Sequence, residues 1–165
     1  MAKQNTYAPI NAVANYFLLR TNVPAGDVMT HLKLQKLCYF AQAFNLVNHD
    51  CGMFKDTFQA WSHGPVAPAL WRRFKKFTWQ AIGGEGFGSL SIKPLGDSDK
   101  EILDAVWVKL GHWTARELEY WTHQHDPWRN ARGNTPLGAH STAEITIAAL
   151  KKFYCAEKFK KQFTI

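Results

Sequence analysis

The chain has 165 residues, of which 46% are hydrophobic and 20% are charged. This length and balance are typical of one folded globular domain and exclude an intrinsically disordered chain. The formal net charge of +7 favours acidic partners, either proteins or nucleic acids, and the seven Trp, eleven Phe and five Tyr favour a solid core and aromatic-rich contact surfaces.

Apolar periodicity predicts two helices in the first third of the chain. Ile10, Val13 and Phe17 fall at helical spacing, which predicts a helix over residues 10–20. A second helix is predicted from about Thr30 to Val47, with Asp27 or Thr30 as its N-cap. Because this second helix is apolar on most sides, we expect it to be the central helix of the fold.

The segment after the central helix predicts a strand, a corner and a helix. A weak alternation over 54–61 predicts a short strand. His63-Gly64-Pro65 predicts a sharp corner, since glycine permits unusual dihedral angles and proline presets the first turn of a helix. A helix is then predicted from Val66 to Phe77, with Pro68 in its first turn.

The glycine-rich stretch over 83–88 neither follows a buried strand nor opens a clear helix, so it predicts a flexible loop or hairpin tip and not a phosphate-binding loop. Further helices are predicted over 99–110, capped by Asp97 or Ser98, and from Thr114 to His123, where Thr114 and Glu117 form a capping box.

Residues 126–141 are rich in Gly, Pro and Asn and predict a long loop. A terminal helix over about 142–161, capped by Ser141 or Thr142, follows it. These elements predict a mainly α, compact single-domain bundle of about six helices around the central apolar helix, with room for a short β-hairpin. We expect one domain over 1–165, with its core at about 10–128.

Four polar side chains on the central helix, Gln35, Lys36, Tyr39 and Gln42, fall on one side of it. They predict a buried network that pins the helix to the corner at 61–65, because buried polar groups need partners. The alternative is that this face lines a groove that receives a partner. Both interpretations can hold at once.

Two clusters of positive residues stand out. They are Arg72, Arg73, Lys75 and Lys76 in the first, and Lys151, Lys152, Lys158, Lys160 and Lys161 in the second. Charge runs are usually solvated helix faces. The alternative is a docking surface for an acidic protein or for RNA.

The sequence offers little support for catalysis or for a metal. His112, His123 and His125 lie near Asp126, but without the spacing of a helical zinc site. The three cysteines have no C-x-x-C spacing, which argues against a disulfide framework and suits a reducing cytoplasm. The N-terminus has no signal-peptide core and no run of about 18 apolar residues could span a bilayer. We therefore expect a cytoplasmic protein with no cofactor and no bound metal.

Four sequence blocks in this order resemble the Panacea domain of bacterial antitoxins and phage-associated proteins. They are Ala14-Asn15-Tyr16-Phe17-Leu18, His31-Leu32-Lys33-Leu34-Gln35-Lys36-Leu37-Cys38-Tyr39-Phe40-Ala41-Gln42, Phe58-Gln59-Ala60-Trp61-Ser62-His63-Gly64-Pro65-Val66, and Leu118-Glu119-Tyr120-Trp121-Thr122-His123 followed by Pro127-Trp128. Cys38 and Ser62-His63 depart mildly from the family pattern.

The resemblance implies a helical domain that neutralises a toxin encoded by a neighbouring gene through direct binding, without catalysis. It implies toxins of varied kinds, among them alarmone-synthetase-like toxins that shut down translation. An alternative is a nucleic-acid-binding protein that uses the first basic cluster and neighbouring rings. Another is an adaptor that hands the toxin to a protease.

Aromatic and arginine side chains dominate protein interfaces, which selects candidate contact residues. The candidates for binding the partner or shaping its surface are Trp61, His63, Trp71, Arg72, Arg73, Lys75, Lys76, Trp79 and Trp128. The candidates for a structural or groove-lining role are Gln35, Lys36, Tyr39, Gln42, Gly64, Pro65 and His123.

Overall fold

The computed structural model describes residues 7–83 and 90–165 and confirms the mainly α fold. Residues 84–89, which include most of the glycine-rich stretch, lie outside the described residues. In the described part there are eight α-helices, where about six were predicted. The elements are α1 (Ile10–Arg20), α2 (His31–His49), β1 (Phe58–Trp61), β2 (Gly64–Val66), α3 (Pro68–Phe74), α4 (Asp97–Leu110), α5 (Ala115–His123), α6 (Asp126–Arg132), β3 (Glu144–Ile145), α7 (Ile147–Tyr154) and α8 (Glu157–Phe163), with short 3-10 turns at Val23–Ala25 and Lys75–Phe77.

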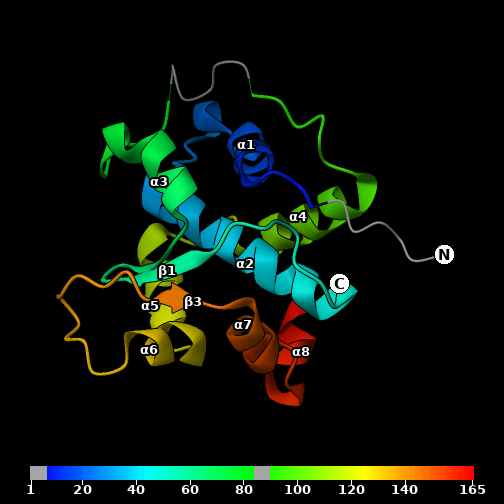
Figure 1. Cartoon of the computed structure of the whole chain (residues 1–165). Coiled ribbons are helices and arrows are strands. Elements are labelled where there is room, and N and C mark those ends of the chain that lie inside the picture. Colours follow the sequence, from blue (N-terminus) through cyan, green and yellow to red (C-terminus); the bar gives the residue numbers. More distant parts are fainter. Residues whose placement is uncertain (1–6, 84–89) are drawn as a thin grey trace.

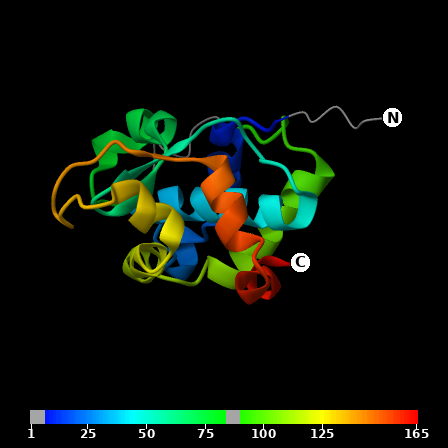
Figure 2. The same ribbon diagram turned by 60° about the horizontal axis from the view of Figure 1, so that its bottom comes forward.

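Helix α2 runs through the middle of the molecule, as predicted (Figure 1). It contacts α1, α3, α4, α5, α7 and α8, and α7 crosses in front of it in Figure 2. Its N-cap is Thr30, whose hydroxyl accepts a hydrogen bond from the Lys33 amide at 3.2 Å; Asp27 has no such role. The all-round burial explains why its sequence is apolar on most sides.

A small antiparallel sheet with strand order β2-β1-β3 lies beside the central helix α2. The predicted strand is confirmed over Phe58–Trp61, and a tight hairpin joins it to β2. The predicted helix start at Val66 is wrong, because Val66 pairs with Gln59 in the hairpin. Helix α3 begins two residues later with Pro68 in its first turn, where the missing amide proton is not needed.

The start of α4 differs from the prediction, whereas the start of α5 agrees with it. Helix α4 is capped by Gly96, whose amide donates to the Asp99 carboxylate at 2.9 Å, so Asp97 is already helical and does not cap. The capping box of Thr114 and Glu117 at the start of α5 is confirmed.

The segment 126–141, predicted to be a loop, contains helix α6 over Asp126–Arg132. Pro127 lies in the first turn of this helix, where its missing amide proton is not needed. The predicted terminal helix over about 142–161 is wrong at its start, and it is two helices instead of one. Its first residues form β3, which pairs with β1, and Thr146 then caps α7. The chain is extended again at Ala156, which separates α7 from α8.

Candidate functional site

The two glutamines of α2 bind backbone groups inside the core. Gln35 Oε1 accepts from the Ala67 amide at 2.8 Å, and its Nε2 donates to the Ala67 carbonyl at 3.3 Å. Gln42 accepts from the Met53 amide at 2.7 Å and donates to the Phe54 carbonyl at 3.0 Å. Both amides therefore hold neighbouring loops against α2, and their hydrogen-bonding groups are used internally.

Tyr39 is buried against the Phe58 ring of β1 and the Tyr154 ring of α7. Its hydroxyl accepts a hydrogen bond from the Tyr154 hydroxyl at 3.3 Å, and the Tyr154 hydroxyl also lies 2.8 Å from His125 Nδ1. Burial raises the pKa of Tyr39 and lowers the pKa of His125 to about 4, so both groups are neutral near pH 7. This chain of three side chains ties α2 to α7.

Lys36, on the central helix α2, binds the hairpin corner at residues 61–65. Its side chain is fully buried, and Nζ donates to the Pro65 carbonyl at 3.0 Å. Gly64 has a φ of +94°, and a Cβ there would lie 2.6 Å from Lys36 Cε and 2.8 Å from Thr122 Oγ1. Desolvation lowers the pKa of Lys36 to about 7, although the carboxylate of Glu119 opposes the shift. Only glycine therefore fits between α2 and α5 at this corner.

The tip of the hairpin carries an exposed histidine with a largely buried partner. His63 Nδ1 lies 2.8 Å from Glu119 Oε1, and the imidazole itself faces solvent. His123, one turn along α5 from Glu119, stacks on the Trp128 indole with ring centroids 3.9 Å apart. Burial lowers the pKa of His123. The histidine at the tip is available to a partner, whereas His123 is packed between α5 and α6.

Most of the predicted contact residues lie on or next to helix α3. The Trp71 ring packs on the Trp61 ring at 5.6 Å, and the Lys75 ammonium lies 5.0 Å from the Trp71 ring centre. Trp79, just beyond the helix, is 84% exposed. We call Trp61, Trp71, Arg72, Lys75, Lys76 and Trp79 the α3 face.

Two of the predicted contact residues have other partners. Arg73 donates to Asn15 Oδ1 at 2.6 Å and to the Asn11 carbonyl, which ties α3 to α1. Trp128 is only 3% exposed, and its Nε1 donates to the Trp61 carbonyl at 2.9 Å. Arg73 therefore holds α3 against α1, and Trp128 holds the backbone at Trp61. The Trp128 ring is buried and is not accessible to a partner.

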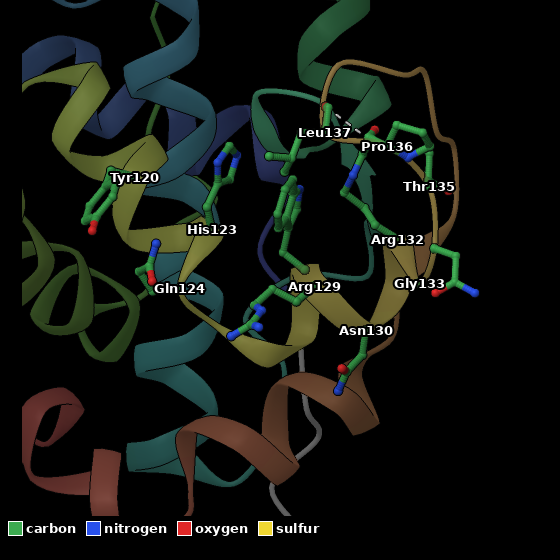
Figure 3. A pocket seen from close by; sticks show the side chains of 12 residues that line it. Tyr120, His123, Gln124, Arg129, Asn130, Arg132, Gly133, Thr135, Pro136 and Leu137 are labelled. Carbon is green, nitrogen blue, oxygen red and sulfur yellow. Dashed lines mark hydrogen bonds between the residues drawn. The ribbon is translucent and has the colours of Figure 1, made fainter.

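A pocket of about 800 Å³ lies between α5, α6 and the loop that follows α6 (Figure 3). We call it the α5–α6 pocket; its lining residues are Tyr120, His123, Gln124, Trp128, Arg129, Asn130, Arg132, Gly133, Asn134, Thr135, Pro136 and Leu137. Sequence reasoning missed this pocket because it treated 126–141 as one loop. The signal that could have found it is Asp126-Pro127, an acidic residue and a proline together at a helix start.

Arg132 fixes the far wall of the α5–α6 pocket. Its guanidinium donates to the carbonyls of Ala60 at 2.9 Å, Pro136 at 2.5 Å and Ala139 at 2.9 Å, which ties the loop to β1. Figure 3 shows the side chain extending from α6 toward Pro136 and Leu137. The loop is therefore held in a defined position although it has no regular structure.

The residues that the structure describes contain no metal-binding cluster of side chains, and Cys38 is deeply buried. No group of three or more His, Cys, Asp or Glu side chains that could hold a metal ion occurs in residues 7–83 and 90–165. Cys38, Cys51 and Cys155 are free thiols, and burial raises the pKa of Cys38, which disfavours the reactive thiolate. None of the helices described here combines the length and hydropathy needed to cross a bilayer.

Comparison with known proteins gives one family and one curated relative. Residues 34–129 match the model of the family described as "Antitoxin SocA-like, Panacea domain". The chain is also 34% identical over 127 residues to a protein named "Antitoxin SocA" from Caulobacter vibrioides (strain NA1000 / CB15N). That alignment covers 71% of this chain and 66% of the relative, so the chain spans just under two thirds of the relative's length. No solved structure gives a significant match.

The family match begins in α2 and ends in α6, so it contains most of the central helix, the hairpin corner, the α3 face and the α5 side of the α5–α6 pocket. The match extends over more than half of the chain and includes the last three of the four sequence blocks, apart from the first residues of the second block. The protein therefore belongs to the SocA-like Panacea antitoxin family.

Proposed function

We propose that the protein is an antitoxin that neutralises a cognate toxin, encoded by a neighbouring gene, by binding it directly through the α3 face. Membership of the antitoxin family supports the function. The observation that supports this binding site is the cluster of accessible rings and cations in the α3 face, where Trp79 is 84% exposed and the Lys75 ammonium lies over the Trp71 ring. Large rings and arginines provide most of the binding energy in protein interfaces.

The α3 face suits an acidic partner and is held rigidly. Arg72, Lys75 and Lys76 lie within five positions of one another, in a chain of net charge +7. Arg73 fixes the helix to α1, and Gln35 holds the chain just before it. A preformed cationic surface loses little conformational entropy on binding and speeds the encounter with an acidic toxin.

The toxin class and the place of action are part of the same proposal. The family resemblance supports a translation-inhibiting, alarmone-synthetase-like toxin, whose substrate site the antitoxin covers or holds inactive. The free thiols fit a reducing cytoplasm. The activity is binding and not catalysis.

Co-expression with the product of the adjacent gene tests the proposal. Growth rescue and copurification are expected for the natural chain. The double variant Arg72→Glu, Trp79→Ala should bind at least about 100-fold more weakly, because each anchor can contribute about 2 kcal/mol. Lys93→Glu, an equally exposed charge reversal outside the face, should bind normally. Rescue of growth without any physical complex would contradict direct binding.

Nucleic-acid binding is the second candidate, favoured by the cation–ring pairs on the same face. Lys75 over Trp71 and the exposed Trp79 resemble the combination that meets phosphates and stacks on bases. Phosphate contacts make affinity fall steeply with salt, whereas a mixed protein interface keeps most of its affinity. Titration of a single-stranded oligonucleotide at two salt concentrations separates the candidates.

Delivery of the toxin to a protease uses the same contact but ends in degradation. Toxin half-life in cells with and without the antitoxin distinguishes this mode from simple blocking. Blocking predicts an unchanged or longer half-life, because the bound toxin is protected, and delivery predicts a shorter one.

A further inference from the structure

We infer that the α5–α6 pocket is a second anchor site, which receives a segment of the toxin that carries a carboxylate beside an apolar side chain. This inference rests on the proposed antitoxin function, but it concerns a surface on different helices from the α3 face. The pocket volume of about 800 Å³ is enough for several side chains of a docked segment.

The charge of the pocket points to an acidic ligand. None of its twelve lining residues is Asp or Glu, and Arg129 offers an exposed guanidinium at its edge. Arg132 is 95% buried, and within the described part of the chain no carboxylate forms an ion pair with it. A buried cation that only carbonyls solvate is stabilised further by a nearby anion.

Two buried nitrogen atoms at the pocket also lack partners. Among the described residues, the buried side-chain atoms without a hydrogen bond are Nε2 of His123 and Nε of Arg132. Both residues line this pocket. Buried polar groups are nearly always paired in native proteins, and Nε–H of Arg132 is always a donor, so its lack of a partner favours an acceptor-bearing ligand such as a carboxylate.

The pocket also has exposed apolar groups for an adjacent side chain. Tyr120 on α5 is 69% exposed and Leu137 on the loop is 72% exposed, and they flank the pocket on two sides in Figure 3. Large apolar side chains at the rim of a polar pocket are typical of surfaces that bind a protein. The ligand therefore needs an apolar side chain as well as a carboxylate.

Helix α3, which carries part of the α3 face, and helix α6, which lines the pocket, lie on either side of β1 (Figure 1). The backbone of β1 connects them: the Ala60 and Trp61 carbonyls accept from Arg132 and Trp128, while the Trp61 ring packs on Trp71. One toxin can therefore contact both surfaces across the hairpin.

Photo-crosslinking in the complex with the adjacent gene's product tests the inference. Benzoylphenylalanine is placed at Tyr120 or Leu137, and at Val108 on α4 as a control that is 77% exposed. We expect crosslinks to the toxin from the first two positions only. Mass spectrometry should place them within a few residues of an Asp or Glu next to an apolar residue.

A charge reversal measures how much the pocket contributes. Arg129→Glu should weaken toxin binding about tenfold, because it repels the carboxylate and removes its cation. Arg129→Lys should restore most of the affinity, and Lys93→Glu should leave it unchanged.

A complex that forms normally without crosslinks at these positions, or with crosslinks only to segments lacking carboxylates, overturns the pocket assignment while the proposed function stands. Failure of any complex to form overturns both. Equal affinity of Arg129→Glu and the natural chain rejects the role of charge.

Discussion

Replacing Lys36 by Met should make the protein more stable at neutral pH. The ammonium is fully buried, and burial lowers its pKa from 10.5 to about 7. At about 1.4 kcal/mol per pH unit, this depression corresponds to about 4 kcal/mol of destabilisation at pH 7. Loss of the hydrogen bond to the Pro65 carbonyl offsets about 1–3 kcal/mol of the gain. Met has a similar shape, so the space beside Gly64 stays filled.

The pH dependence gives the sharper test, because its sign is fixed. The unfolded chain keeps Lys36 protonated up to pH 10.5, whereas the folded chain releases this proton near pH 7. Between these values the unfolded state binds more protons, so the natural protein gains stability as the pH rises. The gain from this group between pH 7 and pH 9 is about 2 kcal/mol. The Met variant lacks it.

Urea unfolding of both proteins at pH 7 and pH 9 provides the measurement. The advantage of Lys36→Met should shrink by about 2 kcal/mol between the two pH values. Cys38 and Tyr39, whose pKa values burial raises, contribute equally to both proteins and cancel. Lys93→Met, at an exposed position, should show no such change. A pH-independent difference between Lys36→Met and the natural protein would refute this account of the buried amine.

Three further substitutions test the framework of the site by equilibrium unfolding. Gly64→Ala should destabilise by about 3 kcal/mol or more, since its Cβ would lie 2.6 Å from Lys36 and its φ is +94°; Gly26→Ala, with a φ of +93° but nothing within 4 Å, should lose only about 1 kcal/mol. Equal losses at the two glycines would mean that steric contact is unimportant. Thr114→Ala should remove about 1 kcal/mol by breaking the capping box of α5, and Thr114→Ser should retain most of it. Tyr154→Phe should destabilise the protein by about 1–2 kcal/mol, because the Tyr154 hydroxyl is hydrogen bonded to a buried tyrosine and a buried histidine. An unchanged free energy of unfolding would mean that these hydrogen bonds do not stabilise the fold.

Local signals in the sequence were enough to predict several elements. The boundaries of α1 match the prediction because its apolar spacing is regular. The starts of α2 and α5 were predictable because Thr30 and Thr114 accept the hydrogen bonds that orphan helix amides require. The central position of α2 followed from its all-round apolar surface.

Signals that depend on distant partners were not readable. Val66 fits the apolar stripe of a helix, and only its pairing with Gln59 makes it a strand residue. In the same way, Ile145 belongs to a strand because it pairs with Phe58, 87 positions earlier. Tertiary pairing of this kind overrides local propensity.

The candidate site was predictable in its chemistry but not in its arrangement. The exposed rings and cations of α3 could be selected from residue types alone. The burial of Trp128 and the hydrogen bond from Arg73 to Asn15 could not be predicted, because both depend on which segments meet in the fold. The α5–α6 pocket needed the unrecognised helix α6.

The segment shared with the family is not by itself a folding unit. The match spans 34–129, yet α1 lies before it, and β3, α7 and α8 lie after it. These flanking elements supply the third strand of the sheet and bury Phe163 against the aromatic rings of α2. A fragment limited to residues 34–129 would expose the edge of β1 and the aromatic rings that Phe163 covers. Such a fragment would be prone to self-association. Swapping partner specificity between relatives therefore calls for grafting surface residues onto the intact chain, not for exchanging the segment over 34–129 alone.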